Sequence, residues 1–149
     1  MMESSGHTDI NGLIVEQMAD AMIYSDKEGI IRGWNAAAEA LFGYPKADAI
    51  GQSLELIIPE HLRDAHWAGF NRAMASGKTR LDGHAAITRS LTRSKGTIYV
   101  EMSFAVVSDS NGKVIGSVAV ARDATRRRQN ERELRERLDT LENLHNGAA

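Results

Sequence analysis

The chain has no cysteine, only two prolines, and no apolar run approaching the ~20 residues that a membrane span requires. Without cysteine it can form no disulfide, no thiolate zinc site, no iron–sulfur ligation and no cysteinyl–flavin photochemical adduct. A metal would therefore have to be held by histidine, methionine or carboxylate. The first residues also lack the charge and apolar core of a signal peptide, so we expect a soluble, cytoplasmic protein that does not enter a membrane.

The charge balance gives no overall field that would attract nucleic acid. Lysine and arginine total 18 against 20 acidic side chains, a formal net charge of −2 at pH 7. The run Arg126-Arg127-Arg128 is more typical of a solvated helix face than of a binding patch. With 149 residues, 42% of them hydrophobic, the chain is long enough for one domain and an extension.

Hydrophobic periodicity and turn residues predict the order of the secondary structure. The expected helices are 10–18, 36–42, 45–50 and 59–76, and the expected strands are 21–25, 30–34, 79–93, 97–107 and 113–122. Two strands, several short helices and three long strands favour an α+β fold. We expect a five-stranded antiparallel sheet with short helices on one face.

The C-terminal part is almost entirely charged, apart from a seam of apolar residues at heptad spacing. The seam consists of Leu134, Leu138, Leu141 and His145. It covers fewer than three heptads, which is marginal without further support. The expected parts of the chain are an N-terminal tail with an amphipathic helix (1–19), a folded domain (20–124) and a coiled-coil helix (125–149).

The segment 59–70 is chemically the most informative, because it places His66 on the apolar side of an amphipathic helix. His84 follows eighteen positions later, beyond a turn at Gly77, in a segment with strand character. A neutral imidazole is a strong ligand for iron, so two histidines on facing elements could hold one heme iron. The alternative is that His66 bonds a backbone carbonyl or faces solvent, and that His84 is a surface residue.

The segment 26–44, DKEGIIRGWNAAAEALFGY, strongly resembles the start of a PAS sensor domain. Further matches are Gly51, Pro59, the turn 94–96 and the segment 122–125. The resemblance extends over about residues 10 to 125 and implies the PAS fold. It leaves the ligand open, since PAS domains bind heme, flavins, small acids or nothing, and one fold commonly hosts many sites.

The segment 58–83 looks most like the heme-binding PAS domains of rhizobial oxygen-sensor kinases and of an oxygen-sensing cyclic-dinucleotide phosphodiesterase. That resemblance implies that His66 is the proximal ligand of heme b. A methionine ligand of the phosphodiesterase corresponds to His84, and the oxygen-stabilising arginine corresponds to Ala86. Alanine cannot donate the charge-assisted hydrogen bond of an arginine. We therefore expect poor oxygen affinity, a possible His66–His84 pair, and carbon monoxide, nitric oxide or redox state as the signal.

Other residues are expected around such a cofactor. The expected apolar lining consists of Leu81, Ile87, Met102, Phe104, Val118 and Val120, although ordinary core packing would explain each of them. Met102 is an alternative sixth ligand. The side chains expected near the heme propionates are Arg63, Arg80 and His61, since a guanidinium suits a carboxylate. Pairing of these groups with Glu60 or Asp64 is the alternative.

The junction before the C-terminal helix is where the resemblance places signal transfer. Asp123 can cap that helix while Arg122 reaches back to the domain, or Asp123 is only a cap. The leucine seam, helped by the N-terminal helix, predicts a parallel homodimer.

The sequence contains no acid–base pair, nucleophile motif or phosphate loop typical of an enzyme. We expect a sensor that binds heme b and acts on a downstream signalling protein or output domain, with a diatomic gas as a possible ligand. A PAS dimerisation or protein-interaction module with an empty or small-molecule pocket is the first alternative. A flavin-binding redox sensor is the second.

Overall fold

The computed structural model describes residues 9–80 and 83–147. The helices are α1 (Ile10–Gln17), α2 (Ala36–Phe42), α3 (Lys46–Ala49), α4 (Arg63–Ser76) and α5 (Thr125–Gly147), with 3-10 turns η2 (Leu54–Ile57) and η3 (Glu60–Leu62). The strands are β1 (Ala21–Asp26), β2 (Ile31–Trp34), β3 (Ala86–Leu91), β4 (Thr97–Ser108) and β5 (Val114–Asp123). This order matches the expected one closely.

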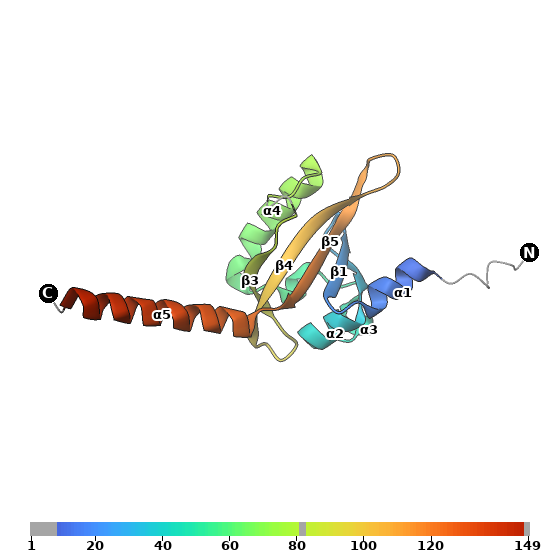
Figure 1. The fold of residues 1–149 in the computed structure, drawn as a ribbon. Coiled ribbons are helices and arrows are strands. Elements are labelled where there is room, and N and C mark those ends of the chain that lie inside the picture. Colours follow the sequence, from blue (N-terminus) through green and yellow to red (C-terminus); the bar gives the residue numbers. More distant parts are fainter. Residues whose placement is uncertain (1–8, 81–82, 148–149) are drawn as a thin grey trace, which may run out of the picture.

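The five strands form one antiparallel sheet in the order β2-β1-β5-β4-β3. The segment between β2 and β3 carries α2, α3 and α4 and packs on one face of this sheet (Figure 1). Strands from the two ends of the domain therefore meet in the middle of the sheet, where β1 pairs with β5. The predicted α+β class, five-stranded sheet and C-terminal helix are confirmed.

One buried asparagine joins three N-terminal elements. The Asn35 side-chain oxygen accepts from the backbone N–H of Ala38 (3.0 Å), where it caps α2, and from that of Met22 (2.9 Å) in β1. Its amide nitrogen donates to the carbonyls of Val15 (2.8 Å) in α1 and Asp20 (3.1 Å). This residue fixes α1 and α2 to the sheet, since a buried amide needs all of these partners.

The core lies between the sheet and the helices. Its largest fully buried apolar side chains are Trp34, Phe42, Ile23, Ile31 and Val100. The rings of Trp34 and Phe42 are 5.5 Å apart between centroids, and the indole N–H of Trp34 donates to the carbonyl of Tyr44 at 2.9 Å. The indole is therefore buried without leaving its polar group unpaired.

The third strand is shorter than the sequence predicts. Strand β3 begins at Ala86 instead of at Thr79, after α4 has ended at the left-handed Gly77 (φ +74°). Gly83 also has a positive φ of +85°, a conformation incompatible with an extended strand. The described residues of this segment therefore include turns, at Arg80 and Gly83, in place of a strand.

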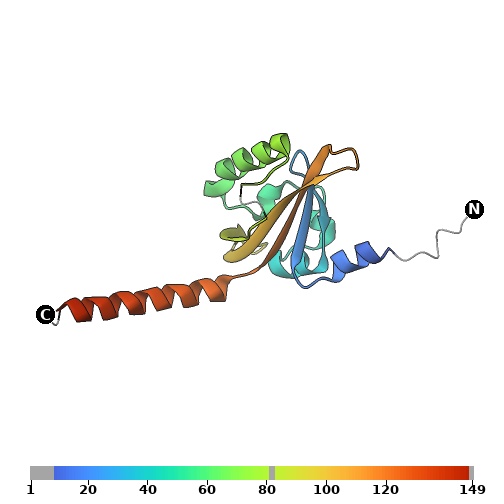
Figure 2. The ribbon, with the colours of Figure 1, turned by 45° about the horizontal axis from the view of Figure 1, so that its top comes forward.

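Helix α5 extends away from the sheet and is held at its first turn (Figures 1 and 2). The N–H of Ala124 donates to the Tyr99 carbonyl at 2.8 Å, and the hydroxyl of Thr125 accepts from the N–H of Tyr99 at 3.1 Å. Arg127 forms an ion pair with Glu101. All three contacts join the start of α5, or the residue just before it, to β4. Within the described ranges, no helix combines the length and apolar character that crossing a bilayer would need.

Candidate functional site

A cavity of about 460 Å³ lies between α4 and the sheet. Its apolar wall includes Ile23, Ile57, Phe70, Met102, Phe104 and Ala119. The volume falls within the usual range for small-molecule and cofactor sites. Met102 and Phe104 therefore lie where the sequence places them, on the inner face of β4, although contact with a cofactor stays a prediction.

His66 lies on α4 and lines this cavity. Its Nδ1 is buried and has no hydrogen-bond partner. The imidazole packs edge-on against Trp67, at 4.7 Å between ring centroids, and stacks with Phe70 at 5.9 Å. A buried nitrogen without a partner is costly, so this atom is an unmet bonding position beside a cavity.

The surroundings of His66 favour its neutral form. Burial lowers its pKa below the ordinary value of 6.5, and the negative charge of Glu55 opposes this shift only in part. Neutral imidazole is the form that binds metal ions. The side chain is therefore in the right protonation state for ligation near neutral pH.

Helix α4 is held firmly, which fixes the position of His66. The indole N–H of Trp67 donates to the Glu55 carboxylate at 2.6 Å. The same indole packs directly against Gly29, where a β-carbon would collide with it. One turn later, Phe70 contacts Phe104 of β4 at 6.3 Å between ring centroids. These contacts tie the helix to η2, the β1–β2 turn and the sheet.

The second predicted ligand reaches the same cavity. His84 is exposed and precedes β3, and both it and the exposed Arg80 line the cavity together with His66. Ala86 lies opposite Met102 in the β3–β4 register. The cavity thus brings together His66, His84 and Met102, the three side chains that the sequence nominates as ligands.

Three predicted lining residues lie outside this cavity. Val118 faces away from it because its neighbours Ser117 and Ala119 point inward from β5. Val120, two residues further along β5, lies on the same outward face as Val118. Ile87 is absent from the cavity lining and lines a separate groove with His61.

Arg63 also differs from its expected role. Its guanidinium donates to the carbonyls of Ile58 (3.1 Å) and Glu55 (3.4 Å) and lies 3.8 Å from the Glu55 carboxylate. These bonds hold the start of α4 to the preceding turns, so the group is already committed to the backbone. Leu81 lies outside the described residues.

Two serines of the cavity wall, Ser90 and Ser117, are not predicted by the sequence pattern. The buried Ser90 hydroxyl donates to the Ile57 carbonyl at 2.8 Å. Ser117 shares a hydrogen bond of 2.9 Å with Ser25 across β5 and β1. Both hydroxyls are satisfied by these bonds, which is why polar side chains occur on an inner face. The only sequence signal for these serines is the alternation of inward and outward residues along a strand, which puts them on the same face as other cavity-lining residues two positions away.

These residues fit a heme group chemically. The described residues contain no cluster of three or more histidine, cysteine or acidic side chains that could hold a bare metal ion. Heme iron needs only one or two axial ligands from the protein. The imidazole of His66 would hold the iron, the apolar wall would contact the macrocycle, and the cationic Arg80 would pair with a propionate.

The junction with α5 has the contacts that the sequence predicts. Arg122 binds Asp20 through two nitrogens at 3.1 and 3.0 Å. Asp123 accepts from the backbone N–H of Thr125 at 2.8 Å. These bonds connect the end of β5 to the start of β1 and to the first turn of α5, and a role in signal relay stays a prediction.

Three curated proteins are similar to this chain. The signal transduction histidine-protein kinase AtoS of Escherichia coli K12 is 27% identical over 142 residues, covering 94% of this chain and 22% of the kinase. The sensor protein FixL of Bradyrhizobium diazoefficiens is 28% identical over 123 residues (83% and 24%). The oxygen sensor protein DosP of Escherichia coli K12 is 28% identical over 110 residues (74% and 13%). The chain thus spans less than a quarter of each relative.

Solved structures show the same fold. The PAS domain of a Colwellia psychrerythraea protein superimposes with a TM-score of 0.69 at 21% identity, covering 78% of this chain and 96% of that domain. An RNA-binding light-oxygen-voltage receptor gives a TM-score of 0.71 at 22% identity, covering 91% and 38%. The family model described as the PAS fold matches residues 12–124. The chain therefore belongs to the PAS family.

Proposed function

We propose that this chain is a sensory module that binds heme b through His66 and passes gas or redox state to its C-terminal helix. The observation that carries the proposal is the buried Nδ1 of His66, which has no partner and belongs to a ring on the wall of an apolar cavity. An iron–imidazole bond would use the bonding capacity of this ring, and such a bond requires the neutral form that burial favours.

The relatives support sensing as the general role, since one of them is named an oxygen sensor and another a signal transduction kinase. This chain presents His84 to the cavity and has the short side chain of Ala86 opposite Met102. A methyl group cannot donate a hydrogen bond to a partly anionic bound oxygen. Carbon monoxide, nitric oxide or redox state therefore suits the site better as a signal.

Strand β4 provides a route from the cavity to α5. Met102 and Phe104 line the cavity, while Tyr99 and Glu101 of the same strand hold the first turn of α5. A shift of β4 would therefore move the base of the helix, and Arg122 with Asp123 would set its direction. The recipient would be an output domain or a separate signalling protein.

The direct test is uptake of hemin by the full chain. We expect one hemin per chain, a sharp Soret band, and loss of that band in His66→Ala because the axial ligand is gone. His61→Ala is the matched control, since this histidine is exposed and lines a different groove. A colourless protein that takes up no stoichiometric hemin would refute the proposal, as would equal spectra for wild type and His66→Ala.

The relay has its own test. Because the chain lacks cysteine, spin labels can be attached at cysteines introduced only at Asn111, in the β4–β5 turn, and at Asn143, on α5. We expect hemin to change the distance distribution between the labels in a sample diluted with unlabelled chain. Arg122→Gln should reduce this change. Identical distance distributions with and without hemin would show that hemin binding does not move α5 relative to the sheet.

The exposed leucines of α5 favour a second function, a dimerising interaction module with no cofactor. Leu134, Leu138 and Leu141 are 59%, 56% and 62% exposed, and exposed apolar residues in a row indicate a partner surface. The hemin experiment distinguishes the two functions, because an interaction module without cofactor would dimerise and stay colourless.

A further inference from the structure

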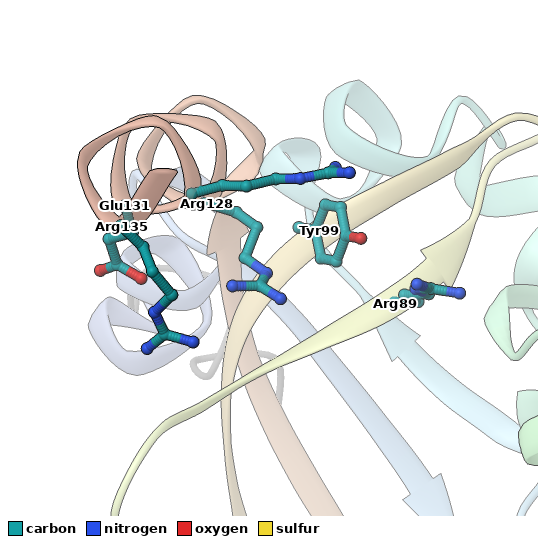
Figure 3. A pocket seen from close by; sticks show the side chains of 6 residues that line it. Arg89, Tyr99, Arg128, Glu131 and Arg135 are labelled. Atoms are coloured by element: carbon teal, nitrogen blue, oxygen red, sulfur yellow. The ribbon is translucent and has the colours of Figure 1, made fainter. Parts of the chain in front are cut away.

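A second pocket, of about 320 Å³, lies where α5 leaves the sheet and is separate from the candidate heme cavity. It is lined by Arg89 of β3, Tyr99 of β4, and Arg128, Glu131, Arg132 and Arg135 of α5 (Figure 3). Four guanidinium groups and one carboxylate thus surround one space, in a chain whose formal net charge is −2. Like charges gathered in this way repel each other unless an anion lies between them.

The positive charge of this arginine pocket is poorly neutralised by the protein. Glu131 pairs with Arg127 at 3.2 Å, and Arg127 is not part of the lining. Arg132 reaches Glu136 only at 3.9 Å, between two highly exposed side chains. In the described part of the chain, no acidic side chain forms an ion pair with the remaining three arginines.

Tyr99 forms the aromatic centre of the pocket. The guanidinium carbons of Arg89 and Arg128 each lie 5.7 Å from its ring centroid, within the range of a cation–π contact. Hydrogen bonding from Arg89, and the positive charges of Arg89 and Arg128, lower the pKa of the Tyr99 hydroxyl. The tyrosine thus responds to the same positive field that an anion would meet.

We propose that the arginine pocket binds a small ligand carrying two or more linked phosphate groups. Guanidinium groups bind phosphate oxygens in bidentate fashion, and one phosphate would not satisfy four of them. The lining comes from β3, β4 and α5. A bound polyphosphate would therefore fix α5 to the outer face of the sheet, and the site is a second input that does not depend on heme.

The pocket also has a physical connection to the first cavity. A groove continues from it and shares Arg89, Tyr99 and Arg128 with it. Thr88 and Arg89 line both that groove and the candidate heme cavity. One strand, β3, thus forms part of the wall of both sites.

Calorimetric titration of the full chain with inorganic tripolyphosphate at low ionic strength tests the proposal. We expect saturable binding of one ion per chain, weakened about tenfold or more by Arg128→Gln or Arg132→Gln, as loss of a hydrogen bond to a charged group predicts. ATP in a parallel titration identifies the source of the ligand. Equal affinity assigns binding to the phosphates alone, while tighter ATP binding adds the base, and either result supports the site.

Arg137→Gln is the matched control, because Arg137 is an exposed arginine of α5 outside the pocket. It should change the affinity less than twofold, and the Nε–Hε NMR signals of Arg89 and Arg128 should shift during the titration. Thermal melting verifies that each variant is folded. The proposal is overturned by the absence of saturable binding, by equal weakening in Arg137→Gln, or by variants that alter only the oligomeric state.

Discussion

His66 shows how far residue type and spacing lead. Its place on the apolar side of a helix was predictable from periodicity, and the structure places it on a cavity wall with an unpartnered Nδ1. The burial of that nitrogen could not be predicted, because it depends on contacts with Trp67 and Phe70 and on the way α4 meets the sheet. Arg63 illustrates the opposite outcome, since backbone carbonyls bind its guanidinium.

The lowered pKa of His66 predicts a pH dependence of folding stability. Burial holds the folded pKa below 6.5, so below about pH 7 the unfolded chain binds more protons than the folded one. The free energy of unfolding should therefore fall as pH decreases from about 7 through the folded pKa. Urea unfolding of the protein without cofactor, at a series of pH values, measures this slope.

Two variants isolate the contribution of His66 to that slope. His66→Phe keeps the ring packing and removes the titration, so it should flatten the slope. His61→Gln removes an exposed histidine and should leave the slope close to that of the wild type. Equal slopes for His66→Phe and the wild type would show that the buried imidazole does not drive the effect.

Strand β5 shows why the cavity wall was predicted only in part. Both of its faces are apolar or small, so alternation of polarity does not distinguish inside from outside. The larger Val118 looked like the core residue, yet the small Ser117 and Ala119 face the cavity. Small side chains fit there because Phe70 and Phe104 already occupy space beneath the helices.

The contact between α4 and the β1–β2 turn gives a prediction for Gly29. A β-carbon there would collide with the Trp67 ring, whereas one at Gly112 would meet open space, and both glycines have a positive φ (+79° and +81°). Gly29→Ala and Gly112→Ala therefore share the backbone strain of about 1–3 kcal/mol. Only Gly29→Ala adds overpacking, worth about 1–3 kcal/mol more. If urea unfolding gives equal losses of unfolding free energy for both variants, the Trp67 side chain moves aside at little cost.

On the scale of the whole molecule, α5 is a helix without enough contacts of its own. Beyond the first turn its leucines are exposed, whereas helices in proteins gain most of their stability from packing of an apolar face. Pairing with a second copy would bury the seam. The chain covers less than a quarter of the length of each of these curated relatives.

Sedimentation velocity tests the seam. Leu138→Lys places a charge in the middle of the seam and should shift a dimer toward monomer. Leu144→Lys is the control, because Leu144 is at least as exposed as Leu138 (65% against 56%) but is not one of the seam residues. Loss of the dimer in both variants, or in neither, would show that this seam does not hold the two copies together.

Chemical rescue is the sharpest test of the proposal that the His66 imidazole is an axial ligand. Hemin added to His66→Ala should give a spectrum unlike that of the wild type, and free imidazole should restore the wild-type Soret band by entering the space the side chain leaves. A His66→Ala spectrum identical to that of the wild type before imidazole is added would show that His66 does not bind the iron.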